Sequence, residues 1–102
     1  MKSRKEGSEL IITFDERMDS ANCALAAKEV EKAIADAKAT AGASLKVKFD
    51  IALVTYGSSS FLRICLTAAK SVGKDSFSIA GANESLRKVF SIAGFDKIMT
   101  IS

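Results

Sequence analysis

Three serines follow a glycine near the middle of the chain, in the order Gly57-Ser58-Ser59-Ser60. The residues before them are typical of a strand, and those after them have the apolar spacing of a helix. A turn from a strand into a helix places hydroxyls beside free N–H groups and the positive end of the helix dipole. Such a turn can hold an anion or carry a phosphate on one serine. In the alternative interpretation, one serine is the N-cap and the others are solvated.

Little else in the chain has the residue types that catalysis or metal binding requires. Histidine is absent, which excludes Ser-His-Asp triads, Cys-His pairs and histidine-bound metals. Two cysteines, Cys23 and Cys65, are too few for a four-cysteine zinc site or a disulfide framework. Both lie among Ala and Leu, as small buried apolar residues do. The serine turn lacks the Gly-Lys-Ser/Thr of a nucleotide P-loop.

Carboxylates follow the first predicted strand at Asp15, Glu16 and Asp19, and Asp50 lies within the second. Paired carboxylates can carry out acid–base chemistry or bind a divalent cation. Nothing at the right spacing supplies a nucleophile or a third ligand, and carboxylates after a strand commonly cap helices. We therefore expect a protein that is not an enzyme and holds neither a metal nor a cofactor.

The length and composition indicate one domain spanning residues 1–102, with an ordinary balance of 48% apolar and 26% charged residues. A net charge of +3 is too small to indicate nucleic acid or membrane as a partner. The longest apolar runs, 10–12 and 51–54, fall far short of the ~20 residues that span a bilayer. Without an export signal, the two thiols favour a reducing cytoplasm. Residues 1–7 are expected to be flexible or to form a short edge strand.

Strands and helices alternate along the chain. Alternating and β-rich segments predict strands over 10–14, 45–56, 76–80 and 98–101. Apolar residues at steps of three and four predict the three helices. The first runs from Ala24 to Gly42, with Ser20 or Asn22 as its N-cap, the second from Ser60 to Gly73, and the third from Asn83 to Gly94. This order predicts a small α/β sandwich with four or five mostly parallel strands and three or more helices.

The second predicted helix is apolar over an unusually wide part of its circumference. Its inner stripe contains Leu62, Cys65, Leu66, Ala69 and Val72. Phe61, Ile64 and Ala68 occupy a neighbouring face. Such a helix is either deeply packed or offers an apolar face to a partner. The sequence leaves both interpretations open.

Three segments resemble STAS domains, the family of the anti-sigma-factor antagonists. Residues 49–63, FDIALVTYGSSSFLR, resemble the central segment, in which a hydrophobic strand leads to Asp-Ser-Ser-Gly-Leu at a helix start. Residues 17–22, RMDSAN, resemble the family's Arg-Leu-Asp-Ala-x-Asn. Residues 85–98 resemble its last helix, with the ending Leu-x-x-x-Gly-Leu-Asp-x-Leu. The resemblance covers residues 8–101 and implies the STAS sandwich.

This resemblance implies a switch that works by protein binding. Family members bind an anti-sigma factor, typically a serine kinase, and so release a sigma factor. The kinase phosphorylates the serine that aligns with Ser59, for which Ser58 and Ser60 are the alternatives. The implied partner-binding residues are Asp19, Asp50, Gly57, Ser58, Ser60, Phe61, Arg63 and Ile64. A corner sealed beneath other elements, with Phe61 and Ile64 facing inward, would argue against docking there.

Two departures from the family pattern fall on this turn. Ser58 replaces the family's aspartate, and Phe61 replaces its glycine. A kinase that reads the aspartate would not find it, and a ring at Phe61 would block close approach or anchor in a different groove. The departures favour an alternative, a STAS subunit or scaffold of a transport or signalling complex that is not phosphorylated. A small nucleotide- or anion-binding protein is a third reading, and the oligomeric state is left open.

Overall fold

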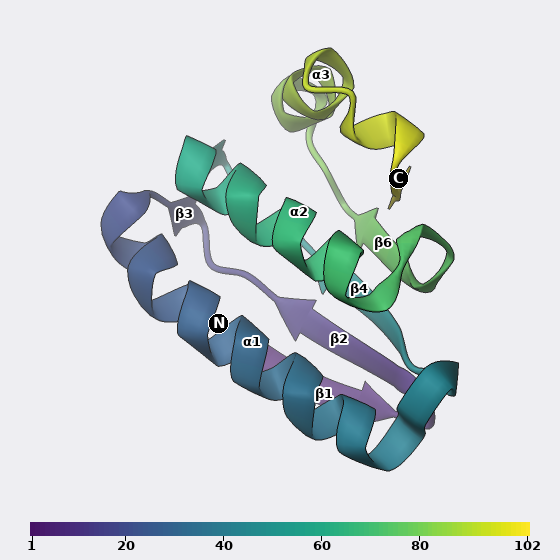
Figure 1. Cartoon of the computed structure of the whole chain (residues 1–102). Coiled ribbons are helices and arrows are strands. Elements are labelled where there is room, and N and C mark those ends of the chain that lie inside the picture. The colour runs from purple at the N-terminus through teal and green to yellow at the C-terminus, as the bar shows by residue number, and fades with distance from the viewer.

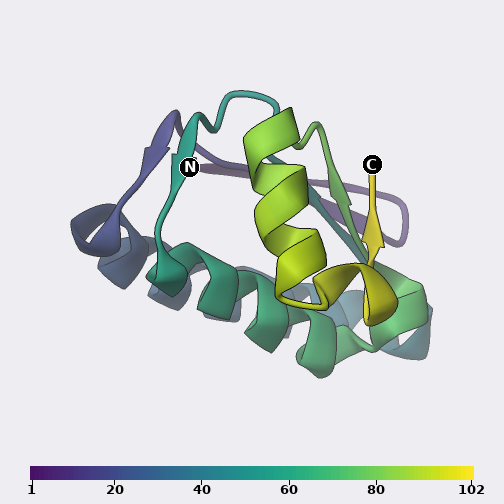
Figure 2. The same ribbon diagram turned by 90° about the horizontal axis from the view of Figure 1, so that it is seen from above.

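The computed structural model describes residues 1–102, the side chain of Lys74 excepted, as two layers. One layer is a five-stranded sheet, and α1 and α2 lie side by side on one face of it (Figure 1). Helix α3 stands beside α2 and spans the depth of both layers (Figure 2). The helices are α1 (Ser20–Ala41), α2 (Ser59–Val72) and α3 (Glu84–Ile92).

The main sheet has the order β1-β2-β4-β6-β7. Only β1 is antiparallel to its neighbour, so the expected α/β fold with a mostly parallel sheet is confirmed. The first residues form an edge strand, one of the two expected states of this segment. The strands are β1 (Lys2–Glu6), β2 (Glu9–Thr13), β4 (Lys46–Asp50), β6 (Phe77–Ala80) and β7 (Thr100–Ile101). A separate pair joins β3 (Arg17–Met18) to β5 (Tyr56–Gly57).

Aromatic rings fill the space between the sheet and the helices. Because side chains alternate along a strand, Val47 and Phe49 of β4 face the helices while Lys46 and Lys48 face away. The Phe49 ring lies edge-on to those of Phe14 and Phe77, each at 4.8 Å between centroids. These aromatic rings, called here the aromatic row, pack between the sheet and the helices. They therefore fix where α2 lies relative to the strands.

The predicted strand over 45–56 is wrong beyond Asp50. The backbone turns there, because the Asp50 carboxylate accepts a hydrogen bond from the Ala52 N–H at 3.1 Å. The Val54 N–H donates to the carbonyl of Ile51 and completes the turn. Tyr56 then enters β5, which leaves the main sheet and pairs with β3. An apolar run thus contains a turn that hydrophobicity alone does not reveal.

The last predicted strand, 98–101, is wrong in its first half. The N–H groups of Ile98 and Met99 both donate to the carbonyl of Phe95, which places them in a turn after a 3-10 helix (Phe95–Lys97). Only Thr100 and Ile101 pair with β6. A tight turn can place apolar side chains in the core as well as a strand can, and Met99 is buried.

The N-cap of α1 is Asp19, so the predictions of Ser20 or Asn22 are wrong. The Asp19 carboxylate accepts a hydrogen bond from the Asn22 N–H at 3.0 Å. The helix therefore begins at Ser20, before the expected Ala24, and ends at Gly42 as predicted. In the described part of the chain, neither this helix nor any other is long and apolar enough to cross a membrane.

We expect Asp19→Ala to lower the free energy of unfolding by about 1 kcal/mol, because the substitution removes the cap of the longest helix. Ser20→Ala is the matched control, since Ser20 is an exposed first helical residue and its loss should cost about 0.5 kcal/mol or less. Urea unfolding followed by circular dichroism measures both. Equal losses in the two variants would contradict the assignment of the cap.

Candidate functional site

The residues Gly57, Ser58, Ser59 and Ser60, called here the α2 corner, are held by the β3–β5 pair. Met18 pairs with Gly57, and the carbonyl of Met18 accepts a hydrogen bond from the Ser58 N–H at 3.0 Å. The Ser58 carbonyl in turn accepts from the N–H groups of Phe61 and Leu62, at 3.0 and 3.2 Å. The backbone of the α2 corner is therefore fixed on both sides, by a strand before it and a helical turn after it.

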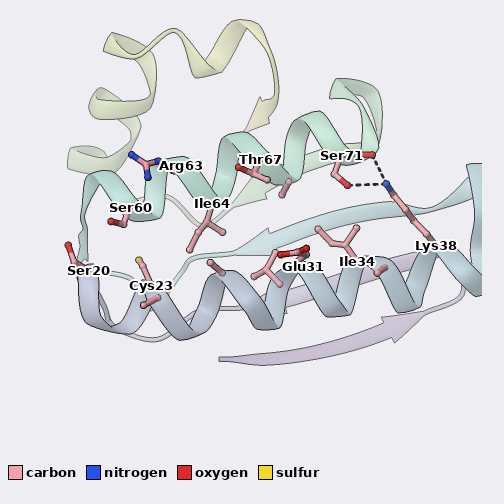
Figure 3. A pocket seen from close by; sticks show the side chains of 15 residues that line it. Ser20, Cys23, Glu31, Ile34, Lys38, Ser60, Arg63, Ile64, Thr67 and Ser71 are labelled. Carbon is pink, nitrogen blue, oxygen red and sulfur yellow. Dashed lines mark hydrogen bonds between the residues drawn. The ribbon is translucent and has the colours of Figure 1, made fainter.

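The three serines of the α2 corner have different surroundings. Ser58 is buried, at 9% exposure, and its hydroxyl lies 3.9 Å from the sulfur of Cys23. Ser59 is the first residue of α2 and is exposed. Ser60 is half-buried and lies at the same end of the two helices as Ser20 (Figure 3). Of the three hydroxyls, that of Ser59 is the most accessible to an enzyme.

Ser58 is the N-cap of α2 in its backbone but not in its side chain. Its φ of −77° and ψ of 173° are the extended conformation of a cap residue. Its hydroxyl makes no capping hydrogen bond, because it points inward to Cys23. The N–H groups of Ser59 and Ser60 belong to the first turn, which has no intrahelical acceptors. Helix α2 thus offers donors and positive dipole to an anion at this end.

Phe61, Ile64 and Ala68 are buried, so their interpretation as an apolar partner face is wrong and the packing alternative is right. Helix α2 covers the sheet with one side and lies against α1 with another, which explains its wide apolar circumference. The Phe61 ring is fully buried, 5.3 Å from that of Phe14 in an edge-on arrangement. It therefore neither blocks the α2 corner nor anchors a partner. Phe61 and Ile64 face inward, but the corner is not sealed, because Ser59 is exposed.

Gly57 is required by this ring. A Cβ atom at Gly57 would lie 2.9 Å from Cδ2 of Phe61 and 3.3 Å from Cδ2 of Leu86. The glycine and the phenylalanine therefore fit as a pair, with the ring in the space that a side chain at Gly57 would take. Both residues contribute to the α2 corner through the position that they give to its backbone.

Three residues before Ser59 in the chain, Tyr56 carries an arginine stacked on its ring. The guanidinium carbon of Arg17 lies 4.7 Å from the centroid of the Tyr56 ring, and Tyr56 is 45% exposed. Arg17 Nε also lies 3.4 Å from a carboxylate oxygen of Asp19. Arg63, four residues after Ser59, is exposed on the same side of α2. The sequence did not assign Arg17 or Tyr56 to the site, because strands of two residues have no periodicity.

The structure brings Asp19 to the surroundings of the α2 corner and leaves Asp50 apart from it. Asp50 ends β4, and its side chain lies on the face of the sheet opposite to Phe49. Its carboxylate holds the turn through Ala52. Among the described side chains, no hydrogen bond or ion pair joins Asp50 to the four residues of the α2 corner.

The two cysteines are buried, as the sequence predicted. Burial raises the pKa of Cys23, and it raises the pKa of Cys65 much further. The Cys23 thiol donates a weak hydrogen bond to the Met18 carbonyl at 3.5 Å. Both thiols are thus held in the protonated, unreactive form. In the part of the chain that the structure describes, no three His, Cys, Asp or Glu residues are grouped as metal ligands.

We expect Gly57→Ala to lower the free energy of unfolding by about 1–3 kcal/mol, because the new methyl group overlaps the Phe61 ring. In a Phe61→Leu background the ring is gone, so the same substitution should cost less. Urea unfolding of the four proteins of this double-mutant cycle measures the coupling. Additive losses would show that Gly57 and Phe61 do not constrain each other.

No protein-family model and no curated protein matches the sequence. Solved structures do match. The anti-sigma factor antagonist SpoIIAA in its unphosphorylated form is 10% identical, with a TM-score of 0.71 over 99% of this chain and 86% of that chain. SpoIIAA of Bacillus in the phosphorylated form, where it is called a cell fate determinant, is 12% identical, with a TM-score of 0.70 over 99% and 89%.

A third solved structure, a candidate anti-sigma factor antagonist from Thermotoga maritima, is 19% identical, with a TM-score of 0.76 over 98% of this chain and 83% of that chain. All three likenesses span nearly the whole chain. The chain therefore has the fold of the anti-sigma factor antagonists, as the resemblance to STAS domains implied.

Proposed function

We propose that this protein is a cytoplasmic anti-sigma factor antagonist, which binds an anti-sigma factor of the serine kinase type through the α2 corner and so frees a sigma factor. The observation that carries the proposal is the placement of Ser59. It is exposed at the first position of α2, on a backbone held by β3 and β5. The shared fold supports the proposal, since one of the solved structures is described as an anti-sigma factor antagonist and another as a candidate one.

The surface around Ser59 suits a protein partner. Tyrosine and arginine are enriched among the residues that contribute most to binding, because each buries much area and keeps a polar group. Arg17 and Tyr56 form such a pair, already stacked before a partner arrives. The β3–β5 pairing holds both backbones, so little conformational entropy is lost on binding. The partner surface in this proposal is therefore Arg17, Asp19, Tyr56, Ser59 and Arg63.

Phosphorylation of Ser59 is proposed as the control of this binding. A phosphate adds about −1.5 to −2 charges at neutral pH, and the N-terminus of α2 stabilises it in the free protein. Arg63 lies one helical turn further on and can pair with it. In the complex the same phosphate loses its hydrating water. It also pairs with Arg63, which the partner would otherwise contact. Both effects favour the free protein, so the modified antagonist releases its partner.

A second candidate function is a STAS subunit that docks at the same surface but is not phosphorylated. The observation that favours it is the inward hydroxyl of Ser58, beside Cys23. An aspartate in this position would give a kinase a fixed charge next to Ser59, and here that charge is missing. The two candidates differ only in whether Ser59 is modified.

Incubation with ATP and an anti-sigma factor kinase of the source cell should place phosphate on Ser59, which mass spectrometry of peptides locates. Ser59→Ala should abolish the modification, since no hydroxyl remains at the exposed position. Ser60→Ala is the matched control and should be modified like the wild type, because Ser60 is half-buried. Phosphate on Ser60 would contradict the assignment. Stable binding without any phosphate would favour the second candidate.

Tyr56→Ala should weaken binding of the anti-sigma factor at least tenfold, the effect typical of truncating a central aromatic residue. Val89→Ala is the control, because Val89 is similarly exposed but lies on α3. Isothermal titration measures both dissociation constants, and circular dichroism verifies that both variants fold. If binding falls with Val89→Ala and not with Tyr56→Ala, the docking surface lies on α3 and not at the α2 corner.

A further inference from the structure

Helices α1 and α2 enclose a groove along their outer sides. The two helices run in the same direction, so that Ser20 lies near Ser60 at one end and Lys38 near Ser71 at the other (Figure 3). The groove is a hollow of about 660 Å³, within the range of small-molecule sites. Val30, Ile34, Ile64 and Ala68 form its apolar floor, and exposed alanines of α1 form one wall.

Lys38 closes one end of the groove with a positive charge. Its Nζ donates to the carbonyl of Ser71 at 2.7 Å and to the hydroxyl of Ser71 at 2.9 Å. An ammonium group has three donors, so one N–H is left for a further acceptor. No carboxylate among the described side chains lies within ion-pair distance of Lys38. A charge bonded only to neutral groups, at the end of an apolar groove, is complementary to an anionic head group.

The groove is long and narrow. From Ser20 to Lys38, α1 rises about 27 Å at 1.5 Å per residue. A volume of about 660 Å³ spread over that length makes the groove elongated rather than round. An unbranched hydrocarbon chain is the ligand with these proportions, since it is long, thin and apolar. The one acidic side chain that lines the groove, Glu31, lies midway and away from the Lys38 end.

We propose that the α1–α2 groove binds one long-chain carboxylate, a free fatty acid. Its head group accepts a hydrogen bond from Lys38, and its tail lies along Ile34, Ile64 and Val30 toward Ser60. The site does not depend on the proposed function and uses none of the exposed residues around Ser59 except Arg63, whose side chain contributes to the lining.

The first test uses cis-parinaric acid, a fluorescent long-chain carboxylate, below its micelle concentration. The wild-type protein should bind it saturably, and oleic acid should displace it. Ala27→Trp should weaken binding at least tenfold, because Ala27 is exposed and lines the groove, which an indole would fill. Ala39→Trp is the matched control on the same helix, since Ala39 is exposed but does not line the groove. It should bind like the wild type.

The second test isolates the charge. Lys38→Met keeps an apolar stem and removes the ammonium group, so it should weaken binding of oleic acid about tenfold and leave its methyl ester unaffected. Circular dichroism verifies the fold of each variant. The proposal is overturned if the wild type does not bind the probe, if Ala39→Trp weakens binding as much as Ala27→Trp, or if Lys38→Met binds the acid unchanged. Loss of a protein partner in Ala27→Trp, with no probe bound by the wild type, would assign the groove to a helix and also overturn it.

Discussion

The contact between the Phe61 ring and the backbone of Gly57 determines the geometry of the α2 corner. The ring fills the space where a Cβ atom of Gly57 would lie, and it packs in an edge-on arrangement with Phe14 of the aromatic row. One side chain therefore joins the start of α2 to β5 and to the core. Because aromatic interiors are close-packed, a shift of this ring would move both elements together. The position of Ser59 follows from that packing.

The helical turn that buries Phe61 also decides which serine faces the solvent. Successive residues of a helix point about 100° apart, so neighbours of an inward residue cannot all face inward. Phe61 and Ser58 both face inward, and Ser59, which lies between them in sequence, is turned outward. Phe61, which departs from the family pattern, is thus the residue that orients the exposed hydroxyl of Ser59.

The sequence predicts the order of elements, the sheet type and most of the core, because those follow from hydrophobic periodicity over many residues. The aspect that it could not predict is local. The turn after Asp50 and the cap at Asp19 each depend on one carboxylate meeting one N–H group, which leaves no periodic signal. The pairing of Arg17 with Tyr56 joins two strands of two residues. The width of the apolar face of α2 was visible in the sequence, but only the placement of α1 beside it shows that the face is covered.

Ser58, which stands where the STAS pattern has an aspartate, fits the local packing. A carboxylate that took the inward position of the Ser58 hydroxyl, close to the Cys23 thiol, would lose hydration, and it would have to turn outward to cap the free N–H groups of α2. A neutral hydroxyl avoids that cost. The serine in place of an aspartate also changes how a phosphate on Ser59 would alter the net charge of the surface. With Arg17, Arg63 and Asp19 as its charged neighbours, the unmodified surface carries a net charge of about +1, and a phosphate of about −2 would reverse its sign. With an aspartate at Ser58 the same phosphate would only add to a surface already near neutral. In the proposed switch, the missing acid would therefore make the electrostatic contrast between the unmodified and the phosphorylated surface a reversal of sign.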